Sequence, residues 1–188
     1  MLATLLAVGI VVLAIVLAMP LFRKAVNDIG GLPLSYSDVI RQQAAEKHLD
    51  AALVAGVIYA ETKFQPRPSS AGAEGLMQIL PQTAQFLARR SGATTFRVSD
   101  LATPEVNIAY GSYYIRYLLD EFHGSEMLAL AAYNGGETNV NRWLADARDQ
   151  GRTLTADDIP FAQTRAYVQK VMSAQRDYRR TYPSQLGY

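Results

Sequence analysis

Apolar residues recur three and four positions apart along most of this chain, which is the spacing of amphipathic α-helices. Start and stop residues divide the pattern into separate helices. Ser37 or Asp38 can cap a first helix, and Asp50 can cap a second over residues 51–60. We therefore expect two amphipathic helices near the start of the folded region.

Prolines, glycines and hydroxyl side chains bound the helices expected further along the chain. Pro81 begins one that stops before Gly92, and Thr103 with Pro104 begins a longer one that Gly124 ends. The others cover residues 125–134, a stretch around Trp143 and a last helix after Pro160. Period-two alternation is weak, so at most a short hairpin fits among residues 62–80 or 92–102. The expected fold class is a compact, mainly α-helical domain.

The N-terminus is a different kind of segment. Residues 2–22 carry no charge and match the roughly 20 residues that span a hydrocarbon core. We predict a transmembrane anchor over residues 1–22. The alternative is a signal sequence, cleaved or retained, but the apolar run is longer than the usual core of about 7–15 residues and lacks a positive flank before it. Residues 23–34 then read as a linker, 35–180 as one domain and 181–188 as a tail.

Composition excludes several functions. Lys and Arg number 18 against 17 Asp and Glu, so no basic field is present to hold nucleic acid. Cysteine is absent and the histidines are only His48 and His123, which argues against zinc clusters, thiol nucleophiles and Ser-His-Asp triads. We expect no metal and no cofactor. Catalysis would have to rest on carboxylates, hydroxyls or amides.

Glu61 is the first candidate for such chemistry. It follows Val54, Val57 and Ile58 by seven, four and three residues, so its carboxylate shares their helix face and should point inward. Apolar surroundings disfavour the charged form, which would raise the pKa of the carboxyl group and suit a general acid. Spacing alone leaves open that the helix frays here and the side chain reaches solvent.

The residues that follow resemble the soluble lytic transglycosylase family. The family pattern E-S-x-F matches E-T-K-F at residues 61–64, and S-S-A-G-A-E-G-L-M-Q-I-L-P-Q-T-A at residues 69–84 matches its glycine-rich motif. Asp100-Leu101, then P-E-V-N-I at residues 104–108 with Gly111, resemble its central helix. The strings A-L-A-A-Y-N-G-G at residues 129–136 and T-R-A-Y-V-Q-K-V at residues 164–171 complete the order. The resemblance covers residues 36–175 and implies an α+β lysozyme-like fold.

Three departures from the family pattern stand out. Thr62 replaces a serine but keeps a hydroxyl, and Gln163 occupies the place of a glutamate. The stretch between Glu61 and Gly72 is one residue short, so the family's serine aligns with Ser69 or Ser70, and Ser69 is preferred. By resemblance, Glu61 is the catalytic residue, and the substrate-binding residues are Ser69, Ser70, Gln78, Tyr133, Asn134, Gln163 and Tyr167.

The resemblance implies an enzyme that cuts the β-1,4 bond between N-acetylmuramic acid and N-acetylglucosamine in peptidoglycan glycan strands and leaves a 1,6-anhydro sugar. One carboxylate would act as acid and then as base, unlike the usual glycosidase pair. Glu74, the other acid in the motif, reads as a solvated loop charge. The substrate would place the domain outside the cytoplasmic membrane, anchored or secreted, although Arg23 and Lys24 weakly favour the opposite orientation.

Three alternatives remain at the level of sequence. A hydrolytic muramidase of the goose-lysozyme type would share the glutamate, a non-catalytic peptidoglycan-binding module would keep only the cleft, and a tethered helical bundle would have no glycan site. Tyr110, Tyr113, Tyr114 and Tyr117 recur at helical spacing and read as a packed aromatic face, although one ring could line a sugar subsite. The sequence does not identify a protein partner.

Overall fold

The computed structural model describes residues 31–188 except 67–68 and 70. The anchor predicted over residues 1–22 and most of the linker predicted at 23–34 lie outside the described residues. Among the helices that are described, none has both the length and the apolar character needed to cross a membrane. Residues Leu34–Tyr188 form one compact unit, which contains the domain expected at 35–180.

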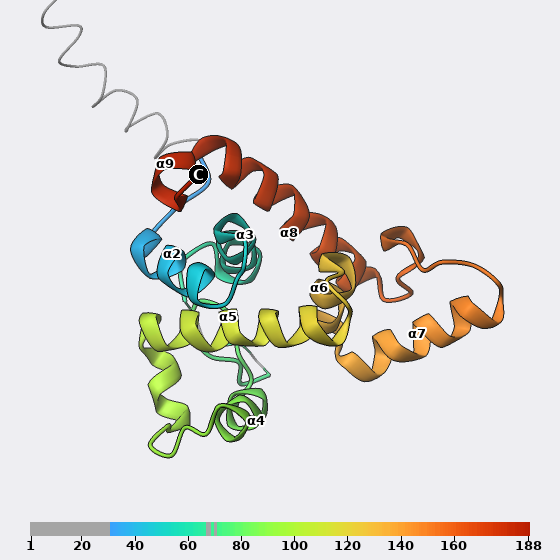
Figure 1. Cartoon of the computed structure of the whole chain (residues 1–188), viewed down its shortest axis with the longest axis horizontal. Helices are drawn as coiled ribbons and strands as arrows, with labels where there is room; N and C mark the ends of the chain where they lie inside the picture. Colours follow the sequence, from blue (N-terminus) through green and yellow to red (C-terminus); the bar gives the residue numbers. More distant parts are fainter. Residues whose placement is uncertain (1–30, 67–68, 70) are drawn as a thin grey trace, which may run out of the picture. The chain divides into compact units, whose positions relative to one another are not determined.

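This unit is built from helices, as the apolar spacing predicted (Figure 1). They are α2 (Ser37–Glu46), α3 (Ala51–Thr62), α4 (Pro81–Ser91), α5 (Pro104–Glu121), α6 (Glu126–Gly135), α7 (Glu137–Asp149), α8 (Ala162–Thr181) and α9 (Pro183–Leu186), with 3-10 turns η1 (Val98–Ala102) and η2 (Ala156–Asp158). Within the described ranges, β pairing is limited to one isolated antiparallel bridge between Glu74 and Ile79. Of the hairpin allowed at residues 62–80, the described residues form only this bridge. In the other allowed range, 92–102, the 3-10 turn η1 covers Val98–Ala102.

Most of the expected helix starts are confirmed. The Asp50 side chain accepts a hydrogen bond from the Ala52 N–H at 2.9 Å, and Ser125 accepts one from Leu128 at 3.4 Å. Pro81 and Pro104 each occupy the first turn of their helix, where the missing N–H has no intrahelical partner to lose.

Two boundary predictions are wrong. Ser37 and Asp38 lie inside α2, because Tyr36 adopts a left-handed conformation with φ 58° and its carbonyl accepts the first helical hydrogen bond from Ile40. The long helix ends at Glu121 rather than at Gly124. Phe122 is buried and turns the chain, and the Gly124 N–H then bonds the Leu119 carbonyl at 2.7 Å.

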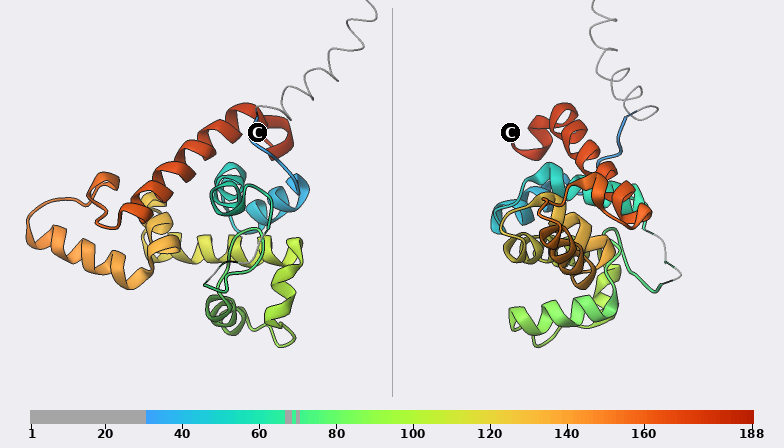
Figure 2. Two further views of the ribbon diagram at one scale, coloured as in Figure 1. Left: turned by 180° about the vertical axis from the view of Figure 1, so that it is seen from behind. Right: turned by 90° about the vertical axis from the view of Figure 1, so that its right-hand side faces the viewer.

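The central element is α3, which is buried on all sides from Ala51 to Ile58. The prediction that this helix is amphipathic is therefore wrong. It packs along α8, and the ribbon views show it between α8 and α5 (Figures 1 and 2). Gly56 permits this approach, since an added Cβ would lie 3.1 Å from the Val171 carbonyl oxygen of α8. On the other side of α5 lie α4 and η1. The last turn of α3 carries Glu61.

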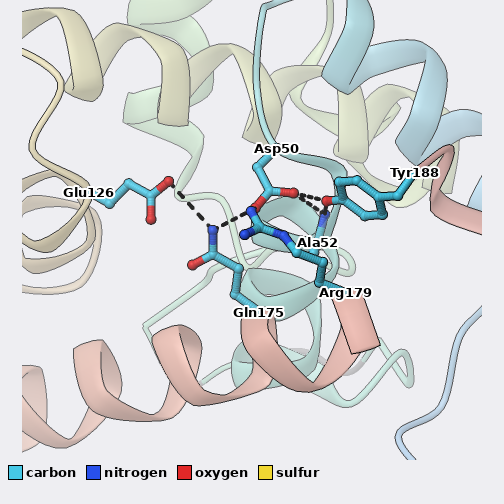
Figure 3. A network of polar contacts seen from close by, with 6 residues as sticks. All are labelled: Asp50, Ala52, Glu126, Gln175, Arg179 and Tyr188. Carbon is cyan, nitrogen blue, oxygen red and sulfur yellow. Dashed lines mark hydrogen bonds and ion pairs between the residues drawn. The ribbon is translucent and has the colours of Figure 1, made fainter. Parts of the chain in front are cut away.

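Asp50 joins the start of α3 to the C-terminal residues (Figure 3). Its carboxylate accepts hydrogen bonds from Arg179 and Gln175 of α8 and from the Tyr188 hydroxyl. Residues 181–188, expected to be a tail, contain α9, bury Leu186 and contact α2 through a hydrogen bond from Arg41 to the Gln185 carbonyl at 2.7 Å.

We expect Asp50→Ala to lower the free energy of unfolding by about 2 kcal/mol, because it removes a helix cap and charged hydrogen bonds from a mostly buried carboxylate. Asp38→Ala is the matched control, since Asp38 pairs with Arg41 while its side chain is 86% exposed, and exposed pairs contribute little. Urea denaturation of both variants measures the difference. Equal losses would mean that the Asp50 contacts do not stabilise the fold.

Candidate active site

The carboxyl group of Glu61 lies at the end of the buried helix α3. Burial is the main cause that raises its pKa from the ordinary 4.5 to about 7. The side chain is only partly exposed, as the apolar stripe of Val54, Val57 and Ile58 predicted. The fraying that the spacing left open does not occur, because α3 continues to Thr62, whose hydroxyl donates to the Leu76 carbonyl at 2.8 Å. At neutral pH, Glu61 can therefore hold a proton or release one.

Two residues of α8 approach Glu61 and oppose this rise in pKa. The hydroxyl of Tyr167 acts first and the ammonium group of Lys170 second. The Tyr167 hydroxyl is buried and faces the Glu61 carboxyl group, and it has no partner of normal hydrogen-bond geometry among the described residues. Lys170 donates to the Ala60 carbonyl at 2.7 Å and lies over the Tyr59 ring. It thus ties α8 to the turn of α3 that carries Glu61.

We expect Lys170→Met to raise the pKa of Glu61 further, because it removes a cation that favours the carboxylate. Lys63→Met is the matched control: Lys63 is two residues from Glu61 but is not among the groups that shift its pKa. Titration of the Glu61 side-chain carbon by NMR would measure both variants. A pKa that is unchanged, or that moves equally in both, would contradict the assignment.

A loop from Glu74 to Ile79 forms one wall of the site, and Asn107 of α5 holds it. The buried Asn107 amide accepts from the Met77 N–H at 2.8 Å and donates to the Glu74 and Leu101 carbonyls at 2.9 and 3.1 Å. These bonds satisfy the donors and acceptor that burial would otherwise leave unpaired. The loop is therefore fixed to α5.

The opposite wall comes from the end of α6. Tyr133 donates its hydroxyl to the Met77 carbonyl at 2.8 Å and stacks on Tyr167 with ring centroids 6.5 Å apart. Asn134 accepts from the buried Thr164 of α8 at 2.9 Å. Burial, and then the nearby Glu61 carboxylate, raises the pKa of both Tyr133 and Tyr167 well above its usual range. Both phenols stay neutral donors at neutral pH.

Between these walls lies a hollow of about 350 Å³ with polar and apolar lining. Its lining residues come from the loop and from α4, α5 and α6: Gln78, Ile79, Leu80, Gln82, Thr83, Tyr114, Ala132, Tyr133, Asn134, Gly135 and Gly136. Glu61 does not line it, and Tyr133, which interacts with both, lies between the two. The arrangement offers a proton donor close to a cleft whose lining can bind a ligand with both polar and apolar groups.

The predicted site residues divide into two groups. Gln78, Tyr133 and Asn134 line the hollow, and Tyr167 lies beside Glu61. The Ser69 hydroxyl accepts from the Ala73 N–H at 2.8 Å, so it organises the turn next to the loop. The structure does not describe Ser70. Gln163 is exposed on the first turn of α8 and lines none of the described hollow.

Sequence reasoning missed the parts played by Asn107, Lys170 and Thr164. The motif resemblance assigns Asn107 no role, although an amide at a buried position of an amphipathic helix needs hydrogen-bond partners there. Thr164 carries a similar signal, because it precedes Val168 and Val171 on the buried face of α8. Lys170 gives no local signal, since its carbonyl partner is 110 residues away.

The chain is similar in sequence to known lytic transglycosylases. The sequence profile of the transglycosylase SLT domain matches residues 38–155. A soluble lytic murein transglycosylase of Salmonella typhimurium is 31% identical over 150 residues, which are 78% of this chain and 23% of that protein. Membrane-bound lytic murein transglycosylase C of Edwardsiella ictaluri is 29% identical over 77% of this chain and 46% of its own length.

A solved structure is also similar. The crystal structure of an inactive glutamate-to-glutamine mutant of the lytic transglycosylase Slt from Pseudomonas aeruginosa aligns with a TM-score of 0.73 and 31% identity. It covers 82% of this chain and 25% of the Pseudomonas protein. The chain thus spans about a quarter of the soluble relatives that it matches.

Proposed function

Because the chain belongs to the transglycosylase SLT domain family, we propose that it is a lytic transglycosylase acting on peptidoglycan. It would cleave the β-1,4 bond between N-acetylmuramic acid and N-acetylglucosamine and leave a 1,6-anhydro-muramic end. The observation that carries this proposal is Glu61, a carboxyl group with a pKa raised to about 7 by burial beside a cleft.

In this proposal Glu61 moves one proton twice. Its protonated carboxyl group donates the proton to the glycosidic oxygen as the bond to the muramic C1 breaks, which releases the other sugar as an alcohol. The resulting carboxylate then takes the proton from the muramic 6-hydroxyl as that oxygen bonds to C1. Glu61 ends protonated again, and no water is consumed.

The surroundings of Glu61 support a single acid rather than a pair. The groups that shift its pKa are Tyr167 and Lys170, and no other carboxylate is among them in the described part of the chain. The acetamido group of the substrate can stabilise the cationic C1 in place of a second carboxylate, an exception to the usual glycosidase pattern. A glutamate-to-glutamine mutant of the Pseudomonas relative is inactive, which agrees with a required glutamate.

We propose substrate-binding roles for the remaining predicted residues. The amides of Gln78 and Asn134 can bond sugar hydroxyls and acetamido groups from the wall of the hollow, and Tyr167 can donate to a substrate oxygen beside Glu61. We propose that sugars of the glycan strand further from the cleaved bond contact Ser69, Ser70 and Gln163. No cofactor or metal enters the proposed reaction.

We also propose that residues 35–180 form the catalytic domain and that residues 1–22 anchor it to the membrane, with the domain on the outer side where peptidoglycan lies. A membrane-bound relative from Edwardsiella ictaluri supports an anchored arrangement. A secreted form, released by cleavage of that segment, is the alternative. Protease protection in intact and permeabilised cells would show whether the domain lies on the outer or the inner side of the membrane.

The product identifies the reaction. Purified full-length chain in mild detergent is incubated with peptidoglycan sacculi, and mass spectrometry measures the released muropeptides. Anhydro-muramic ends would support the transglycosylase. Reducing ends would identify a hydrolytic muramidase, and binding to sacculi without any product would identify a non-catalytic binding module.

A further inference from the structure

Three side chains of α8 follow one another past the site at a spacing of three residues. Thr164 bonds Asn134 at the wall of the hollow. Tyr167 comes next and lies beside Glu61. Lys170 is the third, and it bonds a carbonyl in the last turn of α3 without lining the hollow. A glycan strand that runs from the hollow along α8 therefore passes Glu61 and then reaches Lys170.

Lys63 is a second cation at this end of the site. It is the C-cap of α3, where a left-handed conformation with φ 52° ends the helix two residues after Glu61. Its side chain is exposed. Burial is the first cause that lowers the pKa of Lys170, and the charge of Lys63 is the second. The two ammonium groups are therefore close enough to repel each other, and we call them the lysine pair.

The lysine pair has no anionic neighbour other than Glu61 in the described part of the chain. Neither of its members forms an ion pair there, whereas Lys47 pairs with Glu46. Glu61 raises the pKa of Lys170, but its own pKa of about 7 leaves part of its carboxyl groups uncharged at neutral pH. Positive charge beside the catalytic carboxyl group is thus left without a matching anion.

We propose that the lysine pair binds a carboxylate carried by a muramic acid residue of the glycan strand and so selects the strand by charge. This inference rests on the proposed function. The N-acetylated sugar rings of peptidoglycan are uncharged, and the carboxylates lie on the muramic substituent, either on a free lactyl group or on the peptide attached to it. Two neighbouring ammonium groups can both donate to one carboxylate, and the bound anion offsets their repulsion.

Lys170 is held in place for this role. Its ammonium group donates to the Ala60 carbonyl at 2.7 Å and lies 5.6 Å from the centre of the Tyr59 ring. An ammonium group has three N–H donors, so two remain for a ligand. Lys63 makes no side-chain hydrogen bond to a described residue, and its ammonium group keeps all three. The pair combines a fixed cation with one that can move onto the ligand.

A purely structural role makes a different prediction. If Lys170 only tied α8 to α3, Lys170→Met would weaken the binding of charged and uncharged ligands alike, and Lys63→Met would change neither. A carboxylate site instead makes both substitutions weaken only those ligands that carry the carboxylate. Ligand charge is therefore the variable that separates the two roles.

The test measures binding by calorimetry, with the full-length chain in mild detergent carrying Glu61→Gln so that ligands stay intact. The ligands are a peptide-free tetrasaccharide of alternating N-acetylglucosamine and N-acetylmuramic acid, the same tetrasaccharide with its peptides, and a form of each with the carboxylates converted to amides. Adding Lys63→Met or Lys170→Met should weaken binding of a carboxylate ligand roughly three- to tenfold and leave its amide form within about twofold. A loss with the peptide-free ligand assigns the carboxylate to the lactyl group, and a loss only with the peptide-bearing ligand assigns it to the peptide.

Lys47→Met is the matched control, because Lys47 follows α2 and pairs with Glu46. Equal weakening for charged and amide ligands, weakening from only one of the two lysines, no weakening, or the same effect from Lys47→Met would overturn the carboxylate site. Product analysis of the unmutated chain on sacculi runs in parallel. Absence of anhydro-muramic product there would refute the proposed reaction, while the comparison of charged and amide ligands would still decide the role of the lysine pair.

Discussion

Glu61→Gln is expected to lower kcat on peptidoglycan by roughly 10²–10⁴-fold, the usual contribution of a positioned proton-transfer group. Glutamine keeps the size and hydrogen-bonding capacity of the side chain but cannot donate or accept the proton. Affinity for sacculi should change little, because the hollow is lined by other residues. The release of anhydro-muropeptides over time, set against sacculus cosedimentation, separates the two quantities.

Glu74→Gln is the matched control for this substitution. Glu74 is the other acid in the same motif, and the loop uses its backbone, which bonds Ile79 and Asn107. Neutralising the side chain should therefore leave kcat within about twofold, as for a typical surface change. If Glu74→Gln lost activity as strongly as Glu61→Gln, the single-acid mechanism would be wrong.

The same Glu61 variant should be more stable than the unmutated protein at alkaline pH. The folded-state pKa of Glu61 is about 7 against an ordinary 4.5, so between these values the folded state binds more protons than the unfolded state. Stability contributed by this group therefore falls as pH rises through that window. Glutamine removes the penalty, worth on the order of 2 kcal/mol after allowance for partial exposure. Thermal unfolding at pH 4 and pH 8 should show the gain only at pH 8.

Local chemistry explains why many helix boundaries were predictable. A cap such as Asp50 or a first-turn proline such as Pro81 acts through neighbouring backbone groups, so the sequence alone determines its effect. The inward direction of Glu61 followed in the same way from its spacing to Ile58. Tyr36 could not be predicted as the start of α2, because a left-handed conformation is unusual for tyrosine and no neighbouring residue type indicates it.

Contacts between residues that are far apart in the sequence could not be predicted, because no local pattern indicates which elements pack together. Residues 51–58 contain no polar side chain, which indicates burial on all sides, but the sequence does not show that α8 and α2 are the elements that cover this helix. The bonds from Lys170 to the Ala60 carbonyl and from Tyr188 to Asp50 join residues more than 100 positions apart. Motif resemblance indicated that Gln78, Tyr133 and Asn134 lie near one cleft and Tyr167 near Glu61, but not that Tyr167 and Lys170 adjust the pKa of Glu61.

Gly75→Ala should be the most disruptive single-methyl change in the site loop. A Cβ at this position would lie 2.1 Å from the Asn107 amide nitrogen and 2.7 Å from the Leu101 carbonyl oxygen. Because Asn107 is buried and bonded to three backbone groups, it cannot move aside without breaking them. We expect a loss of roughly 3–4 kcal/mol in unfolding free energy, the sum of a positive-φ penalty and overpacking.

Gly72→Ala isolates the collision from the backbone strain. The two glycines have nearly equal φ values, +75° for Gly72 and +72° for Gly75, but among the described residues no atom beyond the chain neighbours lies within 4 Å of a Cβ at Gly72. Gly72→Ala should therefore cost only about 1 kcal/mol and leave kcat almost unchanged. Gly75→Ala should also reduce kcat, since the shifted loop carries Gln78 and the Met77 carbonyl that binds Tyr133. Urea denaturation and product release measure both effects, and similar values for the two variants would show that Asn107 does not hold the loop rigidly.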